Sequence, residues 1–228
     1  MKNRWCHFLF CIVATCFILG AGCKLEEDVE NPFDPDNAIS ENSINCDALV
    51  FDYQKETGCD GKIYNDPNKL EYMIPFPIGT AFRMGLSNCS SSYHGAGNPD
   101  QYAYDFDLPL NTIFTAAKPG KVVRVVEDQP SGGGGVGNYV VIDQEDGTFG
   151  LYYHAPKNGI SVEVGDEVDY GTALGLVGRS GLAGYPHLHF IVVQDGYRYP
   201  YNGIPVSFSN VSPPVVVLQS YQNYMVCE

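Results

Sequence analysis

The stretch NYVVIDQEDGTFGLYYH, residues 138–154, decides the fold class of this chain. Two runs rich in β-branched and aromatic residues, 138–142 and 149–154, flank the dipeptide Asp146-Gly147, which is typical of a tight hairpin turn. The stretch therefore predicts two antiparallel strands joined by a short turn, and the second of these strands ends at His154.

Further strand candidates lie on both sides of this hairpin. They are short, rich in apolar and aromatic side chains, and separated by Gly, Asp and Asn, and they cover residues 121–126, 173–178 and 188–193. Residues 162–175 read as two short strands around a turn. Because no segment has the periodicity of an amphipathic helix of four turns, we predict a mainly β domain with a compact antiparallel sheet.

The composition excludes several classes of protein. The chain has 228 residues and a net charge of −14, whereas a protein that binds a nucleic-acid backbone needs clustered Lys and Arg. We therefore expect no nucleic-acid partner. The glycine-rich segment 131–137 lacks the helix and the lysine that follow in a phosphate-binding loop, so we predict that its glycines permit a tight or mobile rim.

The first 22 residues have the pattern of a signal peptide. Lys2 and Arg4 form a short basic region, and the apolar stretch 8–22 that follows is too short for an ordinary membrane span. We therefore predict that residues 1–22 direct export of the chain and are then removed.

The end of this signal resembles a bacterial lipoprotein signal, in which Cys23 would receive the lipid. We predict a lipid anchor at Cys23 and a place in the cell envelope; ordinary cleavage after Ala21 or Gly22, followed by secretion, is the alternative. Residues 23–45 are acidic and contain few apolar side chains, which predicts a flexible tether.

Four cysteines follow the predicted tether: Cys46, Cys59, Cys89 and Cys227. An even number in an exported protein predicts two disulfides. We predict the pairs Cys46–Cys59 and Cys89–Cys227, because the first pair closes a short local loop. A cysteine zinc site is the rival interpretation, but the Cys-x-x-Cys spacing is absent from the sequence. The pairing makes residues 46–77 a disulfide-stapled, loop-rich extension.

The histidines are the most informative polar residues. His187 and His189 begin a predicted strand, so both imidazoles project from one face while the leucine between them points to the other. His154 ends another predicted strand, and His94 lies in a loop. A catalytic zinc takes three ligands from His and carboxylate side chains and leaves one position for water. Two of these histidines and an aspartate such as Asp105 would suit it, leaving two histidines for acid–base chemistry.

Several motifs resemble, in the same order, those of the lysostaphin-type (LytM-like) zinc metallopeptidases. They are His94 with Asp105, Tyr153-His154, Gly184-Tyr-Pro-His187-Leu-His189-Phe190, and the stretches AYDFDLPLNTIFTAAKPGKVV, GNYVVI, VEVGDEV and GLVGRSG. The resemblance covers about residues 78–195 and implies the duplicated hybrid motif fold of that family. The sequence departs from the family in one respect, because ten residues separate His94 from Asp105 where the most familiar members have three.

The resemblance also implies a site. The implied cofactor is Zn²⁺ with the ligands His94, Asp105 and His189, and the implied catalytic histidines are His154 and His187. Asp107 competes for the carboxylate role, because it lies on the same strand face. We prefer Asp105, which stands four residues before Pro109 as the ligand of the family stands before its proline. Tyr152, Tyr153 and Tyr185 are candidates for one further hydrogen bond.

The function that the resemblance implies is hydrolysis of peptide bonds in the peptidoglycan of bacterial cell walls. The binding partner would be the peptide cross-links of peptidoglycan, and we expect the chain to be a monomer. The peptidase domain would span residues 78–210, followed by a C-terminal strand or tail over 211–228. The main alternative is a catalytically inactive module of the same fold that binds peptidoglycan or activates an amidase. A β-rich adhesion or lectin-like domain is a third interpretation.

Overall fold

The structure of this protein is a computed structural model that describes Cys46 and residues 49–228. The predicted signal peptide, residues 1–22, and the predicted tether, 23–45, lie outside the described residues, so both remain predictions. Within the described residues, no helix is long and apolar enough to cross a membrane.

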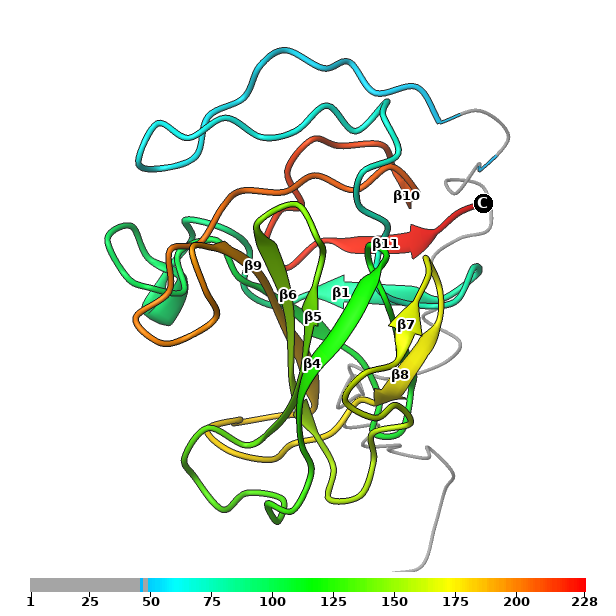
Figure 1. Ribbon diagram of the computed structural model, residues 1–228. Helices are drawn as coiled ribbons and strands as arrows, with labels where there is room; N and C mark the ends of the chain where they lie inside the picture. The colour runs from blue at the N-terminus through cyan, green and yellow to red at the C-terminus, as the bar shows by residue number, and fades with distance from the viewer. Residues whose placement is uncertain (1–45, 47–48) are drawn as a thin grey trace, which may run out of the picture. The chain divides into compact units, whose positions relative to one another are not determined.

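Over residues 49–228 the fold is a large antiparallel sheet with almost no helix (Figure 1). Its nine strands lie in the order β10-β11-β1-β2-β9-β6-β5-β4-β7, and β3 and β8 form a second, two-stranded sheet. In chain order the strands are β1 (Ala81–Met84), β2 (Tyr104–Asp107), β3 (Ile113–Thr115), β4 (Gly120–Val126), β5 (Asn138–Asp143), β6 (Thr148–Ala155), β7 (Glu167–Val168), β8 (Ala173–Leu176), β9 (His187–Gln194), β10 (Val211–Ser212) and β11 (Asn223–Val226). The mainly β, antiparallel fold class is confirmed.

The hairpin predicted from residues 138–154 is formed by β5 and β6. Asp146 and Gly147 lie in the turn between them, where Gly147 has a φ of +89° and the Asp146 carboxylate accepts a hydrogen bond from the backbone N–H of Thr148 at 3.0 Å. Strands β4, β8 and β9 fall on the other predicted runs. Residues 162–175 contain β7 and the start of β8, separated by a turn.

Alternation along the central strands separates the face of the main core from a second face, where a smaller apolar cluster includes Leu151 and Ile191. Phe106 of β2, Tyr152 of β6, and Leu188 and Phe190 of β9 are fully buried in the main apolar core. Because successive side chains of a strand point to opposite faces, the residues between them project to the other side of the sheet. That side receives the aspartates of β2 and the histidines of β9.

The described part of the chain contains two disulfides, as predicted, but the predicted pairing is wrong. The pairs are Cys46–Cys227 and Cys59–Cys89, with Cα–Cα distances of 5.5 and 5.7 Å. The prediction relied on the short loop between Cys46 and Cys59. Pairing is instead set by which Cα atoms tertiary packing brings within reach of a bridge, and packing brings Cys46 to Cys227 and Cys59 to Cys89.

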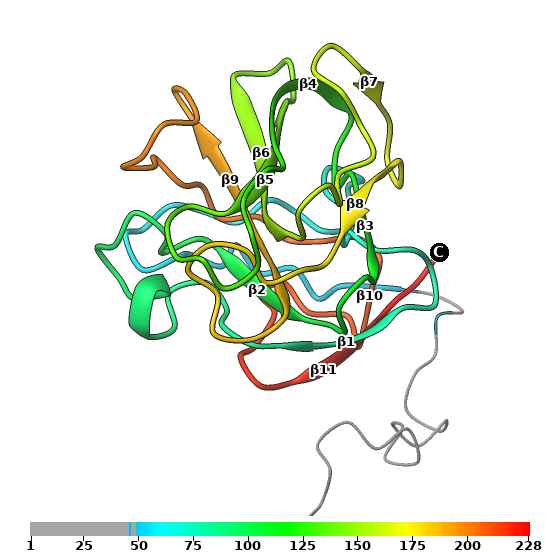
Figure 2. The same ribbon diagram turned by 90° about the horizontal axis from the view of Figure 1, so that it is seen from below.

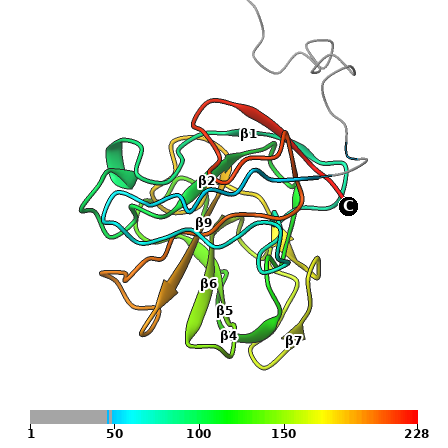
Figure 3. The same cartoon turned by 90° about the horizontal axis from the view of Figure 1, so that it is seen from above.

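This N-terminal extension runs alongside the segment that follows β9. Figures 1 and 3 show the extension in cyan beside the orange chain. Asn65 makes two hydrogen bonds with the backbone of Ser207, at 2.6 and 3.1 Å, and Lys62 Nζ donates to the carbonyl of Gly203 at 2.7 Å. These contacts join residues about 140 positions apart in the sequence. The extension is therefore held against the rest of the fold by polar contacts as well as by its disulfides.

Candidate active site

Three neighbouring strands, β2, β9 and β6, bring the predicted site residues together, and β9 lies between the other two. On one side of β9, Asp105 pairs with His189 and Asp107 pairs with His187. On the other side, Tyr153 of β6 pairs with His189. Because residues directly opposite each other on paired strands project to the same face, these side chains meet on the face opposite the main core.

His94 reaches the same place from outside the sheet. It ends the 3₁₀ helix η2 (Ser92–His94), and its side chain is 1% exposed. The turn is held by the side chain of Asn98, which donates to the carbonyl of Ser92 at 3.0 Å. His94 Nε2 lies 3.3 Å from Asp105 Oδ1, while His94 Nδ1 is buried without a partner among the described residues. The ten-residue spacing to Asp105 thus still permits contact.

The three predicted zinc ligands form a tight cluster. One donor atom from each of His94, Asp105 and His189 lies within 4.8 Å of the other two. His189 Nδ1 and Asp105 Oδ1 are 2.8 Å apart. Two ligand atoms at a tetrahedral zinc are separated by about 3.3 Å, given metal–ligand distances of about 2.0–2.1 Å. The cluster therefore needs only small movements to hold this ion.

Asp107, the competing carboxylate, has a different partner. Its Oδ2 accepts a hydrogen bond from Arg83 Nη1 at 2.7 Å, and it is absent from the cluster of His94, Asp105 and His189. Burial raises the pKa of Asp107, although the charge and hydrogen bond of Arg83 oppose this effect. The structure brings Asp105 into the cluster and leaves Asp107 in an ion pair at its edge.

His154 is aimed by a β-bulge. The register between β5 and β6 shifts between Asn138 and Tyr139, so that His154 is an extra residue on β6, and its φ of +76° is left-handed. His154 Nδ1 lies 2.8 Å from the carbonyl oxygen of Ser180. The imidazole ring lies 4.7 Å, between centroids, from that of His187. Sequence reasoning placed His154 at the strand end, but the bulge is what turns its ring toward the site.

Both non-ligand histidines have the same protonation pattern. His154 Nδ1 contacts the Ser180 carbonyl and His187 Nδ1 contacts the Tyr185 carbonyl at 2.9 Å. A carbonyl only accepts hydrogen bonds, so each Nδ1 bears the proton and each Nε2 keeps a lone pair. Burial lowers the pKa of His154 to about 3, assisted by the nearby His187 and His189, and burial also lowers the pKa of His187. Both rings are therefore neutral near pH 7 and able to accept a proton.

The ligand cluster has the opposite electrostatic balance. Burial alone would raise the pKa of Asp105, but hydrogen bonds from His189 and His94 outweigh it and hold this pKa well below the usual range. Burial likewise opposes protonation of His189, but hydrogen bonds to Asp100 and Asp105 raise its pKa to about 9. Without metal, the cluster therefore holds a proton on His189, which metal binding must displace.

The glycine-rich segment 131–137 packs against the loop that precedes β9 (Figure 2). Leu182 N donates to Gly135 O at 2.9 Å. A Cβ on Gly137 would lie 2.7 Å from Ser180 O, and the positive φ of Gly137, +81°, also favours glycine. The close approach of the two backbones fixes the Ser180 carbonyl, which holds His154. The rim predicted for this segment is thus a tight one.

The three candidate tyrosines have different environments. Tyr152 lies in the core, where its hydroxyl accepts from Ala117 N at 2.9 Å, so it cannot serve the site. Tyr153 OH bonds Tyr201 OH at 2.7 Å, and its ring lies 5.8 Å from that of His189. The Tyr185 ring lies 4.7 Å from that of His187 and is 40% exposed. Tyr153 and Tyr185 therefore border the histidines.

Asp100 is a site residue that sequence reasoning missed. Its Oδ1 lies 3.5 Å from His189 Nε2, the ring nitrogen that faces away from Asp105. Asp100 belongs to the ten-residue insertion between His94 and Asp105, and no strand pattern covers that segment. The only sequence signal was an acidic residue in an insertion between two predicted ligands, which does not reveal where the side chain points.

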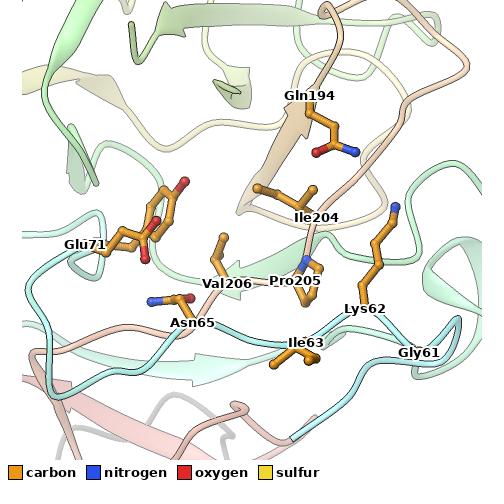
Figure 4. Close-up of a pocket in the computed structure, with 10 residues that line it drawn as sticks. Gly61, Lys62, Ile63, Asn65, Glu71, Gln194, Ile204, Pro205 and Val206 are labelled. Carbon is orange, nitrogen blue, oxygen red and sulfur yellow. The ribbon is translucent and has the colours of Figure 1, made fainter. Parts of the chain in front are cut away.

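A separate cavity of about 520 Å³ lies between the extension and the segment that follows β9 (Figure 4). Lys62, Asn65, Glu71, Gln194 and Val206 are among its lining residues. None of the five predicted site residues lines it, so this cavity is distinct from the histidine site.

Comparison with known families decides the class of the domain. Residues 100–201 match the peptidase family M23. The chain contains a peptidase M23 domain. The matched segment includes Asp105, His154, His187 and His189, and His94 stands six residues before it. The predicted resemblance to lysostaphin-type peptidases is confirmed at the level of this family.

The M23 domain is similar to segments of longer bacterial enzymes. It is 32% identical over 97 residues to the glycyl-glycine endopeptidase ALE-1 of Staphylococcus capitis, covering 42% of this chain and 25% of the relative. It is 34% identical over 92 residues to the peptidoglycan DD-endopeptidase ShyA of Vibrio cholerae, covering 40% and 20%. The chain thus spans a quarter or less of the length of these relatives.

Among solved structures, the catalytic domain of the prophage-encoded M23 protein EnpA from Enterococcus faecalis, in a variant form, is similar to this chain. The two are 24% identical, with a TM-score of 0.46, and the match covers 58% of this chain and 94% of the EnpA domain.

Proposed function

We propose that this protein is a zinc-dependent endopeptidase that hydrolyses peptide bonds of bacterial cell-wall peptidoglycan. The observation that supports the proposal most is the cluster of His94, Asp105 and His189 beside two neutral histidines, all on one face of the sheet. A cluster of this composition has both the ligands of a catalytic metal and the groups that move protons.

The donor set fits zinc better than the other common ions. Two imidazole nitrogens and one carboxylate oxygen are the ligands of many catalytic zinc sites, whereas Ca²⁺ and Mg²⁺ prefer oxygen ligands alone. Three protein ligands also leave a fourth position for water or substrate. We propose His94 Nε2, Asp105 Oδ1 and His189 Nδ1 as the donor atoms, because these atoms face one another at 2.8 and 3.3 Å.

Zn²⁺ in such a site acts as a Lewis acid toward the peptide carbonyl and lowers the pKa of water toward about 7. The chain supplies the rest of the chemistry. His187 Nε2 lies 3.7 Å from Asp105 Oδ1 and faces the ligand cluster, with its proton held on the opposite nitrogen. It is therefore placed to accept a proton from the attacking water. His154, in ring contact with His187, is placed to orient the water or return a proton to the leaving amine.

The proposed substrate class follows from the relatives. ALE-1 is a glycyl-glycine endopeptidase and ShyA is a peptidoglycan DD-endopeptidase, so similar M23 domains act on peptide bonds of more than one chemistry. We propose peptidoglycan peptides as the class of substrate. Export to the cell envelope through residues 1–22, with a lipid at Cys23, would place a monomeric enzyme beside that substrate.

The decisive test uses defined muropeptides and mass spectrometry. The zinc-loaded protein should release peptide fragments, and removal of zinc by a chelator should stop the release until zinc is restored. His154→Ala and His187→Ala should each keep zinc, as measured by elemental analysis, and lose about 10²–10⁴-fold in rate. If the zinc-loaded protein hydrolyses no type of peptidoglycan but still sediments with it, the non-catalytic binding module is the correct function.

A further inference from the structure

The ring of His189 has a carboxylate at each nitrogen. Asp105 Oδ1 lies 2.8 Å from Nδ1, and Asp100 Oδ1 lies 3.5 Å from Nε2. The side chains of His189 and Asp100 are 14% and 21% exposed, so both groups are largely removed from water. Asp105 belongs to the metal-binding cluster and Asp100 does not. The two carboxylates therefore act on opposite sides of one imidazole.

We infer that Asp100 is a positioning residue, which accepts the Nε2–H of His189 and thereby directs Nδ1 toward the zinc. The inference rests on the proposed ligand set. A histidine that binds a metal through one nitrogen bears a proton on the other, and an acceptor there fixes the tautomer and the ring orientation and increases the basicity of the ligand. The 3.5 Å separation is at the outer limit of a hydrogen bond, within reach of this role.

The segment around Asp100 is fastened to the extension, which explains how a loop residue keeps its position. The next residue, Gln101, donates from Nε2 to Asp60 at 3.0 Å, and Tyr102 donates its hydroxyl to the same carboxylate. The carbonyl of Gln101 accepts from Cys89 N at 2.7 Å. Cys89 is itself bonded to Cys59, the neighbour of Asp60. A disulfide and three hydrogen bonds thus hold the two residues that follow Asp100.

This arrangement gives the insertion between His94 and Asp105 a function. The ten residues form successive turns, in which Asn98 N donates to Gly95 O, Gln101 N to Asn98 O, and Ala103 N to Asp100 O. The last of these bonds orients the backbone of Asp100 just before β2 begins. The insertion therefore returns the chain to the sheet with a carboxylate beside the outer nitrogen of His189.

The test measures zinc affinity of the full chain by competition with a chromophoric chelator. Asp100→Asn keeps the shape of the side chain and removes its charge, and it should weaken zinc binding about 10–100-fold. Asp100→Glu, which restores a carboxylate, should recover most of this loss. Asp128→Asn removes the same charge from an exposed loop residue and should leave the affinity unchanged.

Two further readouts separate positioning from folding and from the proposed function. Asp100→Asn should change the visible spectrum of the Co²⁺-substituted protein, and its metal-free form should still unfold in a single cooperative transition. Wild-type zinc affinity in Asp100→Asn, or no recovery in Asp100→Glu, would refute the role of Asp100. Full zinc binding in His189→Ala would instead refute the proposed ligand set on which the inference rests.

Discussion

The two disulfides should stabilise the fold unequally, and their removal tests the pairing. Cys46 and Cys227 are 181 residues apart, and Cys59 and Cys89 are 30 apart. The loop-closure entropy that each bond removes from the unfolded chain corresponds to about 5 kcal/mol for the first pair and about 4 kcal/mol for the second. We therefore expect Cys46→Ser/Cys227→Ser to lower the free energy of unfolding by about 1–2 kcal/mol more than Cys59→Ser/Cys89→Ser.

Chemical unfolding of the two double variants, each compared with the wild type in the metal-free state, measures this difference. Single variants identify the partners: Cys46→Ser should expose one reactive thiol, which peptide mapping should assign to Cys227. Assignment of that thiol to Cys59 would refute the pairing. A larger loss from the Cys59→Ser/Cys89→Ser variant would refute the loop-entropy argument, because it would mean that local packing outweighs the length of the closed loop.

Three further predictions concern single side chains. Asp105→Asn should abolish zinc binding in elemental analysis, whereas Asp107→Asn should retain it; the reverse result would exchange their roles. In the unfolded chain His154 becomes protonated below about pH 6.5, whereas in the folded protein it does so only near pH 3. The free energy of unfolding should therefore fall by up to about 1.4 kcal/mol per pH unit as the pH decreases from about 6.5 to 3. Metal-free His154→Gln should have a shallower slope in denaturant titrations, and equal slopes would contradict the burial of a neutral ring. Gly120→Ala would place a Cβ 2.2 Å from a backbone carbonyl oxygen of the next strand, and it should lower the free energy of unfolding by about 1–3 kcal/mol in thermal unfolding. The control Gly184→Ala, whose Cβ would have no heavy atom within 4 Å, should lower it by under about 0.5 kcal/mol. Similar losses of stability in the two variants would contradict the clash.

Patterns with a local cause could be predicted from the sequence. The alternation of strand side chains determines that His187 and His189 share a face, and Asp146-Gly147 determines the turn between β5 and β6. These features depend on residues a few positions apart. The strands and the shared face of the two histidines could therefore be identified without knowing which segments pair.

Features that depend on distant packing could not be predicted. The cysteine partners are 181 and 30 residues apart, and their pairing follows from tertiary packing that no local pattern encodes. Asp100 lies in an insertion with no periodicity, and its position depends on hydrogen bonds to Asp60, about 40 residues earlier. The carbonyls that hold His154 and His187 are backbone groups, and side-chain patterns give no information about them.

The bulge at His154 makes the site depend on the number of residues in β6 as well as on their identity. Removing Ala155, the residue that follows, would restore uninterrupted alternation with His154 opposite Asn138, and the imidazole would then turn to the core face of the sheet. A chain altered in this way would still contain all five site residues in the same order. An inventory of those residues would class it as active, although one of the two neutral histidines would be missing from the site. Comparisons among related domains should therefore align this strand by its hydrogen-bond register before activity is inferred from the residues present.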